Sequence, residues 1–321
     1  MVYVDYIRGL AMLTIIYVHT NAVLEFEHLT KYVYSFQIWI FFFISGYLCK
    51  KLKSWNDYPG FVWKNFVKLM VPYFACLPLS TLLNYLREEP VRALIDNIFY
   101  AHLSFGATWF LPAMFLCSMI AVPLLSFSRS WPIPVIAGVG SFALGMFASN
   151  SNLVSDYFRW QQALVAVPFF LAGALYRQNQ DRWEKRPHKL VGIALLVIGL
   201  ITCFSNDVIY VSRMDLGIAP ITFISGTATT IGLFELFCFR RSFRNPLARG
   251  IAWTGRHSMG VLCMHLFCIY LNYHLALPPP WSPAGIWILL VVNIILSFLE
   301  MAILITLWNF GKGYIRERKT R

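Results

Sequence analysis

Long apolar runs separated by short polar segments set the pattern of the whole chain. A run of about 20 apolar residues is long enough for a helix to cross the hydrocarbon core of a bilayer. The pattern therefore predicts an all-α, polytopic transmembrane helical bundle that forms a single domain over residues 1–321. The ten predicted spans cover residues 7–25, 32–49, 66–86, 108–127, 132–149, 160–176, 190–206, 218–238, 257–276 and 285–308.

The composition agrees with a membrane protein and excludes other classes. Hydrophobic residues make up 58% of the chain and charged residues 13%, whereas a soluble domain carries about 25% charged residues. Soluble globular, disordered and disulfide-scaffold proteins are thereby excluded. Nearly all of the seven Cys lie within apolar runs, and we interpret them as small buried side chains rather than metal ligands.

The net charge of +12 has a simple explanation in a membrane protein. In a soluble protein it would suggest nucleic acid, but here the positive-inside rule accounts for it, and we expect no nucleic-acid partner. With the N-terminus in the cytoplasm, 22 of the Lys and Arg residues fall in cytoplasmic segments and 5 in external ones. This distribution predicts that both termini are cytoplasmic and that the number of spans is even.

The first span combines several polar residues with a long apolar run. We expect it to be retained rather than cleaved, because acidic Glu25 and Glu27 follow it in place of a small-residue cleavage site. Arg8 and His19 are 11 positions apart, which places both on one helix face about 16 Å apart along the axis. Asp5 can pair with Arg8 across one turn. Arg8 alone also fits a membrane anchor, and His19 a satisfied polar residue near the rim.

Three further groups of polar residues lie at the predicted span ends. Lys64 and Lys68 share a helix face at the cytoplasmic rim, where they could bind an anionic cofactor or lipid headgroups. Ser45 and Gly46 are typical of close helix packing. Trp109, at the start of the fourth span, is also typical of an aromatic belt.

Late in the chain, polar and acidic residues again interrupt apolar runs. Ser258 precedes His265 within the ninth span. Glu235 lies near a cytoplasmic end and could be merely interfacial, whereas Glu300 lies nearer the middle of the tenth span. A carboxyl group at that depth is costly unless it is protonated or paired, and His265 is one candidate partner.

Six short motifs follow one another in order along the chain. They are Asp5-x-x-Arg8-Gly9, Arg8-x10-His19, Phe42-Phe43-Ile44-Ser45-Gly46-Tyr47-Leu48, Lys68-Leu-x-x-Pro72-Tyr73, Trp109-Phe110-Leu111, and Ser258-Met259-Gly260 leading to His265. This ordered set resembles the acyltransferase-3 family of integral membrane acyltransferases. The nearest likeness is to its sugar O-acetylase branch, such as the fucose 4-O-acetylase-like proteins.

The resemblance implies a bundle of about ten helices in a bacterial cytoplasmic (inner) membrane. It also implies transfer of an acyl group, by default acetyl, from cytoplasmic acyl-CoA to a hydroxyl of a cell-envelope or exopolysaccharide sugar. The donor is then acyl-CoA, and the acceptor is a free or lipid-linked carbohydrate. No metal is expected.

Residue roles follow from the same resemblance. His19 matches the family's essential histidine, Arg8 its paired arginine, and Trp109 its important tryptophan. Many members have an Arg-x-x-Arg pair before the Pro-Tyr, where this chain has Asn65 and Lys68, with Lys64 beside them. The expected catalytic residues are His19, Arg8 and Asp5; the expected donor contacts are Lys64, Lys68 and Arg8; and the expected substrate contacts are Trp109, His265, Glu300 and Ser45.

Two questions stay open at this point. Composition alone fits equally well a polytopic transporter or flippase of a polysaccharide precursor, although the chain shows no clear inverted repeat. Within the enzyme hypothesis, His19 either deprotonates the acceptor hydroxyl directly or takes the acyl group first.

Overall fold

The computed structural model describes most of the predicted bundle. The described residues are 1–20, 27–76, 107–151, 157–180, 188–238, 242–275 and scattered positions between 292 and 306. The external loop at 87–106 and most of the tenth predicted span therefore lie outside them. Within the described residues the secondary structure is helical, with an isolated β-bridge between Tyr210 and Asp215.

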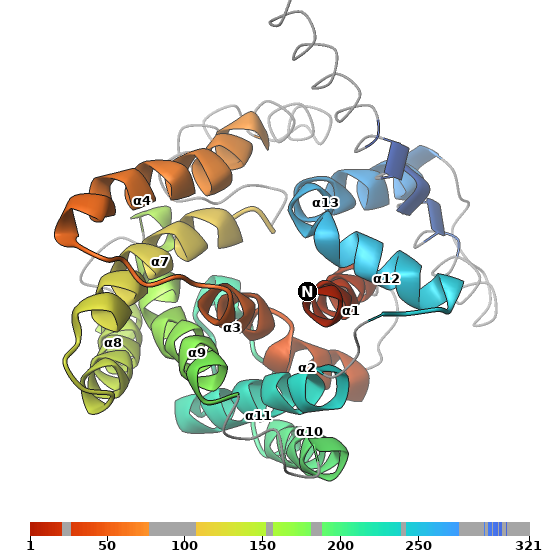
Figure 1. The fold of residues 1–321 in the computed structure, drawn as a ribbon. Coiled ribbons are helices and arrows are strands. Elements are labelled where there is room, and N and C mark those ends of the chain that lie inside the picture. Colours follow the sequence, from red (N-terminus) through yellow and green to blue (C-terminus); the bar gives the residue numbers. More distant parts are fainter. Residues whose placement is uncertain are drawn as a thin grey trace, which may run out of the picture.

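The helices of the first half begin with α1 (Val2–Thr20), which stands near the middle of the bundle (Figure 1). The second predicted span is divided, because a turn at Gln37 and Ile38 separates α2 from α3. The remaining first-half elements are α2 (Glu27–Phe36), α3 (Trp39–Tyr47), η2 (Trp55–Asp57), α4 (Tyr58–Asn65), the π-helical η3 (Phe66–Met70), α7 (Phe110–Phe127) and α8 (Pro132–Ser151).

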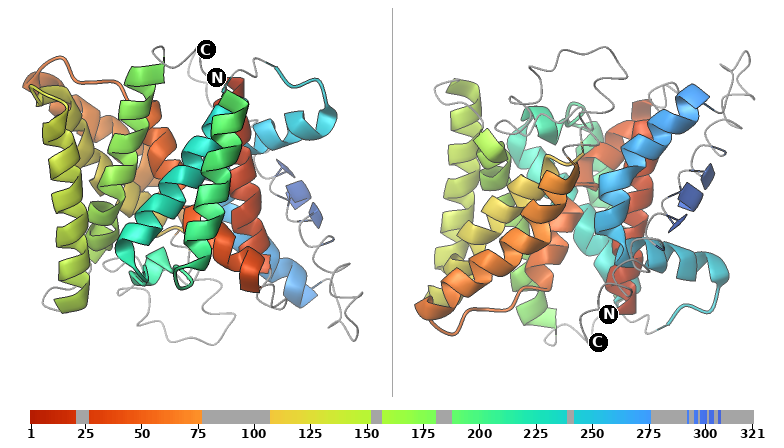
Figure 2. Two further views of the ribbon diagram at one scale, coloured as in Figure 1. Left: turned by 90° about the horizontal axis from the view of Figure 1, so that it is seen from below. Right: turned by 90° about the horizontal axis from the view of Figure 1, so that it is seen from above.

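The helices of the second half complete the bundle around α1. Seen from the side, most of them run between the same two ends, whereas α12 lies across the end at which the N-terminus is found (Figure 2). The second-half elements are η4 (Tyr157–Arg159), α9 (Trp160–Asn179), α10 (His188–Phe204), η6 (Val211–Arg213), α11 (Ala219–Phe237), α12 (Pro246–Arg256) and α13 (Ser258–Leu275).

Length and composition qualify several helices to cross a membrane. Among the described residues, α7, α8 and α11 are long and apolar enough, and α10 and the Ser258–Ile269 part of α13 are shorter apolar helices. Side chains such as Phe147 on α8 and Ile201 on α10 are apolar yet well exposed. Large exposed apolar faces of this kind are typical of a lipid-contacting surface.

Helix α3 forms the buried centre of one half of the bundle. Eight of its nine residues are buried. It can approach α9 closely because glycines face backbone at the contact: a Cβ on Gly46 would lie 1.8 Å from the carbonyl oxygen of Phe170, and one on Gly173 would lie 2.0 Å from that of Phe43. Small residues at such crossings let two backbones pack directly against each other.

Candidate active site

A cavity of about 540 Å³ lies between α1, α3, the α4–η3 segment, α7, α9, α12 and α13. Its lining combines residues from the end of the bundle where the N-terminus lies, such as Arg8 and Lys50, with residues deeper in the bundle, such as Ile15 and Phe110. The space therefore extends along α1 from that end toward the interior.

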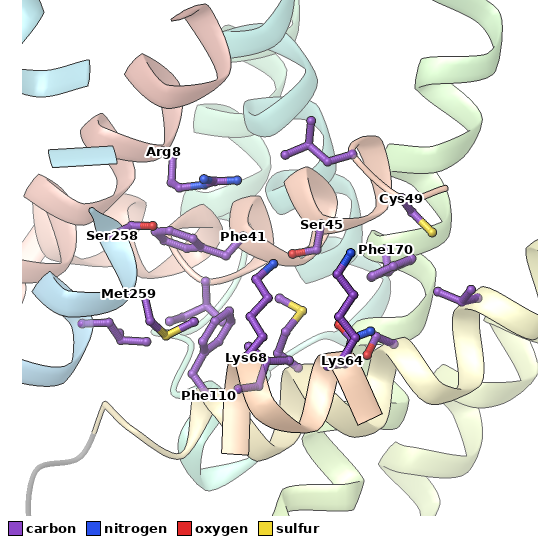
Figure 3. A pocket seen from close by; sticks show the side chains of 18 of the residues that line it. Arg8, Phe41, Ser45, Cys49, Lys64, Lys68, Phe110, Phe170, Ser258 and Met259 are labelled. Atoms are coloured by element: carbon purple, nitrogen blue, oxygen red, sulfur yellow. The ribbon is translucent and has the colours of Figure 1, made fainter. Parts of the chain in front are cut away.

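Five cationic side chains line this cavity: Arg8, Lys50, Lys64, Lys68 and Arg256. The guanidinium of Arg8 and the amines of Lys64 and Lys68 point toward one another across it (Figure 3). No acidic side chain belongs to the lining within the part of the chain that the structure describes. The lining therefore has the charge to attract an anionic ligand, since an anion would relieve the repulsion among the cations.

The local backbone explains how the two lysines reach the cavity. Lys64 lies in the last turn of α4, and Lys68 lies in the π-helical turn Phe66–Met70 that follows. A π-turn widens the helix and is frequent at functional sites. Arg8 and Lys64 are both close enough to act electrostatically on Lys68.

Asp5 lies at the rim of this basic group. The structure pairs its carboxylate with Arg256 of α12, at 3.7 Å between Oδ2 and Nε, and its charge also acts on Arg8. The expected Asp5–Arg8 interaction is therefore shared with a cation that sequence reasoning did not single out. Asp5 joins α1 to α12 and balances part of the cationic charge at the rim.

The deeper part of the cavity is apolar. Met12, Ile15, Phe110, Met114 and Leu262 line it. Apolar walls admit an uncharged, slender chain and exclude charged groups, because a charge there would lose its hydration without a partner. The cavity thus suits a ligand with an anionic head and a neutral tail.

Two histidines meet one helical turn beyond the apolar wall. The ring nitrogen Nδ1 of His19 lies 2.9 Å from the carbonyl oxygen of Ile15 and 3.3 Å from Nε2 of His265. Nδ1 of His265 lies 3.0 Å from the carbonyl oxygens of both Val261 and Leu262. Because Ile15 and Leu262 also line the cavity, the histidine pair lies directly behind its inner end.

The structure places the other expected site residues in different surroundings. Ser45 lines the cavity (Figure 3). Trp109 is buried beside Phe110, which provides the cavity wall at this point. Glu300 hydrogen-bonds the thiol of Cys268, while His265 contacts His19 instead of serving as the carboxyl's partner.

Glu235 belongs to a separate buried group. Tyr176 donates a hydrogen bond of 3.1 Å to one carboxylate oxygen, and His188 contacts the other. Together with Cys238, the potential ligand atoms of His188 and Glu235 lie within 4.8 Å of one another, so this group has the chemistry to hold a metal ion. It is absent from the cavity lining, and its contacts join α9, α10 and α11.

Sequence reasoning missed two cations of the cavity, Lys50 and Arg256. Lys50 was part of the charge count that predicted the topology, and Arg256 directly precedes the segment that begins at Ser258. Neither position forms a local pattern with Arg8 or His19. Their role depends on how α3 and α12 pack against α1.

Comparisons with known proteins agree with these observations at the level of the family. No curated protein and no solved structure matches the chain. The family model of the acyltransferase-3 family, described as an acyltransferase domain, matches residues 1–302. This membrane protein therefore belongs to the acyltransferase-3 family of acyltransferases.

Proposed function

We propose that the protein is an O-acyltransferase that moves an acetyl group from acetyl-CoA to a sugar hydroxyl. The observation that carries this proposal is the order of the features along α1. A basic cavity mouth leads to an apolar inner end, and a histidine pair lies one helical turn beyond that end, outside the cavity lining. Acyl-CoA has the same sequence of chemistry along its length: phosphates, a slender pantetheine arm and a thioester.

The charges indicate how the donor binds. Arg8, Lys64 and Lys68 bind its phosphates at the end of the bundle where the N-terminus lies. The positive-inside rule supports a cytoplasmic location for this end, in keeping with acyl-CoA as a cytoplasmic donor. The resemblance to bacterial sugar O-acetylases supports the inner membrane as the location.

Helical geometry supports the reach of the donor arm. Arg8, Met12 and Ile15 line the cavity along one side of α1, and His19 follows Ile15 by one turn, or about 6 Å. An extended pantetheine arm can follow this path and bring its thioester to His19. The apolar wall favours acetyl over an acyl group that ends in a carboxylate, such as succinyl.

The transfer step needs one base and no external redox partner. Nε2 of His19 takes the proton of the acceptor hydroxyl while the hydroxyl oxygen attacks the thioester carbon. The carbon–sulfur bond breaks, and the proton passes from His19 to the departing thiolate, giving an ester and free CoA. A relay through acyl-His19 gives the same products in two steps.

A sugar hydroxyl as the acceptor rests on the likeness to the sugar O-acetylase branch. We expect the outer loops at residues 87–107 and 206–218 to determine which sugar is accepted; the first falls largely outside the described residues and the second lies within them. We accordingly propose a carbohydrate of the cell envelope or an exopolysaccharide, free or lipid-linked, as the acceptor class. The labelled product of the assay below identifies the molecule.

In the decisive experiment, purified protein in nanodiscs is mixed with radiolabelled acetyl-CoA and an extract of free and lipid-linked bacterial glycans. The release of CoA and the transfer of label to a glycan are measured. Wild type should release CoA and label a glycan, and His19→Ala should abolish both. His28→Ala is the matched control, because His28 is exposed on α2 and does not line the cavity.

Failure would also be informative. If wild type neither binds nor turns over acetyl-CoA, or any of a small panel of other acyl-CoAs, the proposal is wrong. Transport of a polysaccharide precursor would then be the function to assay. A folded His19→Ala variant with wild-type activity would leave the reaction standing and remove His19 from it.

A further inference from the structure

The hydrogen-bond partners of His19 and His265 determine which ring nitrogen of each residue donates and which accepts. Carbonyl oxygens only accept hydrogen bonds, so Nδ1 of His265 carries the hydrogen that it donates to Val261 and Leu262, at 3.0 Å each. A neutral imidazole has one protonated nitrogen, which leaves Nε2 of His265 as an acceptor.

The same reasoning then assigns the hydrogens of His19. Its Nδ1 lies 2.9 Å from the carbonyl oxygen of Ile15 and therefore carries a hydrogen. That hydrogen also faces the acceptor Nε2 of His265, at 3.3 Å between the two nitrogens. The remaining nitrogen of His19, Nε2, is therefore unprotonated, which is what a base or nucleophile requires.

We propose that His265 is a positioning residue that, together with the carbonyl oxygen of Ile15, holds His19 in the tautomer with an unprotonated Nε2. This role rests on the acyltransferase function proposed above. His265 has 0% relative exposure and both of its ring nitrogens have protein partners. In this proposal His265 acts through His19. It takes this role in place of the substrate contact that was expected from the sequence.

The arrangement also supports His19 during the reaction. When His19 takes a proton, the positive charge spreads over both ring nitrogens, and its Nδ1–H becomes a stronger donor to His265 and Ile15. A carboxylate orients the histidine in the Ser-His-Asp triad. Here a neutral imidazole does so, which avoids burying a second permanent charge in the bundle.

Three substitutions separate this role from simple packing. His265→Leu fills the space but removes the acceptor. His265→Gln can place an amide oxygen near the position of Nε2, and His265→Asn places its amide nearer the position of Nδ1. We expect His265→Leu and His265→Asn to lower kcat about 100-fold, with the KM for acetyl-CoA unchanged. His265→Gln should restore kcat to within about tenfold of wild type.

Nitrogen-15 NMR of labelled histidine supplies a readout that does not depend on activity. The His19 signal is identified by its loss in His19→Ala. In wild type it should report a protonated Nδ1 and an unprotonated Nε2. In His265→Leu only the carbonyl of Ile15 still accepts from Nδ1, so the fraction of the other tautomer should rise, whereas a role in packing alone would leave the His19 tautomer unchanged in the folded fraction.

The outcomes distinguish this role from the function on which it rests. A wild type that transfers no acyl group overturns both. An active wild type with an equally active His265→Leu overturns the role of His265 alone. So does a His265→Gln variant no better than His265→Leu, or a His19 tautomer that is the same in wild type and His265→Leu.

Discussion

The cationic side chains that line the cavity interact electrostatically with one another. Arg8 and Lys64 both act on Lys68, and Asp5 is engaged with Arg256 at the rim. Mutual repulsion makes the empty cavity electrostatically unfavourable, so an anion gains more from the cluster than from one isolated cation. Lysine lacks the planar fork of arginine and acts as a point charge, which suits phosphates of variable orientation.

Lys68→Ala tests the assignment of the cavity to the donor phosphates. The loss of one charge-assisted contact should raise the KM for acetyl-CoA about tenfold with little change in kcat. Acetyl-pantetheine lacks the phosphates, so its KM should be unaffected. Steady-state kinetics with both donors measures the difference.

Lys189→Ala is the control for this prediction. It removes the same charge from an exposed position in the first turn of α10 that does not line the cavity. Equal effects of Lys68→Ala on both donors would contradict phosphate binding. An equal effect of Lys189→Ala would indicate a general effect of net charge.

At the scale of elements, α1 organises the site. It carries Arg8 and His19 on one face and packs closely against α12, where a Cβ on Gly9 would lie 1.9 Å from the carbonyl oxygen of Ile251. The α3–α9 contact is equally tight. These contacts hold α12 against α1 and α3 against α9, because backbone packed against backbone leaves no side chain that could adjust.

Gly173→Ala should destabilise the bundle through the α3–α9 contact. Its Cβ would lie 2.0 Å from the carbonyl oxygen of Phe43, so the two helices must separate at a cost on the order of 3 kcal/mol. Thermal unfolding in detergent measures the loss.

Gly140→Ala is the matched control in α8. A Cβ at Gly140 meets nothing within 4 Å, so this variant should unfold at the wild-type temperature or slightly above it, given the higher helix propensity of alanine. Equal stability of the two variants would show that the α3–α9 contact is looser than the structure indicates.

The buried contact between His188 and Glu235 joins the start of α10 to the end of α11. His188→Leu removes a partner of a fully buried carboxylate and should lower the free energy of unfolding by about 3 kcal/mol. Because neither residue lines the cavity, the KM for acetyl-CoA should not change. His28→Leu, at an exposed position, should leave stability nearly unchanged, and a raised KM in His188→Leu would contradict a purely structural role.

At the scale of the whole molecule, apolar side chains lie on the outside of the bundle and cationic side chains gather around the cavity inside it. Exposed apolar side chains cover α8 and α10, while the basic cavity lining includes Arg8 in the first half of α1, toward the N-terminus. A protein with this arrangement can take a charged donor from one side of the membrane without exposing it to lipid.

Cysteine labelling tests the orientation of the bundle. Asn56 and Asp207 are exposed, and the charge count predicts that their segments lie on opposite sides of the membrane, because Asn56 lies between Lys53 and Lys64 on the cytoplasmic side. With the N-terminus in the cytoplasm, Asp207→Cys should react with a membrane-impermeant thiol reagent in intact cells, and Asn56→Cys only after permeabilisation. None of the seven native cysteines is in a disulfide, so the labelling of wild type is subtracted. The opposite pattern would invert the proposed topology.

Several features of the fold could not be predicted from the apolar pattern. The second predicted span is interrupted at Gln37 and Ile38, although its residues are apolar on both sides. Helix α12 has 11 residues and lies across the end of the bundle at which the N-terminus is found (Figure 2). Its residues fall between the eighth and ninth predicted spans. The interruption of the second span and the orientation of α12 both depend on how these segments pack around α1 and α3. The order of apolar residues along the chain carries no information about that packing.

The sequence by itself determined the features that depend on local geometry and composition. These are the helical class, the membrane character, the family, and the placement of Arg8 and His19 on one face of α1. Only the tertiary structure decided which distant residues meet: His265 with His19, Arg256 with Asp5, and Cys268 with Glu300. The reason is physical: helical periodicity relates neighbours in sequence, whereas contacts between helices depend on how whole helix faces pack.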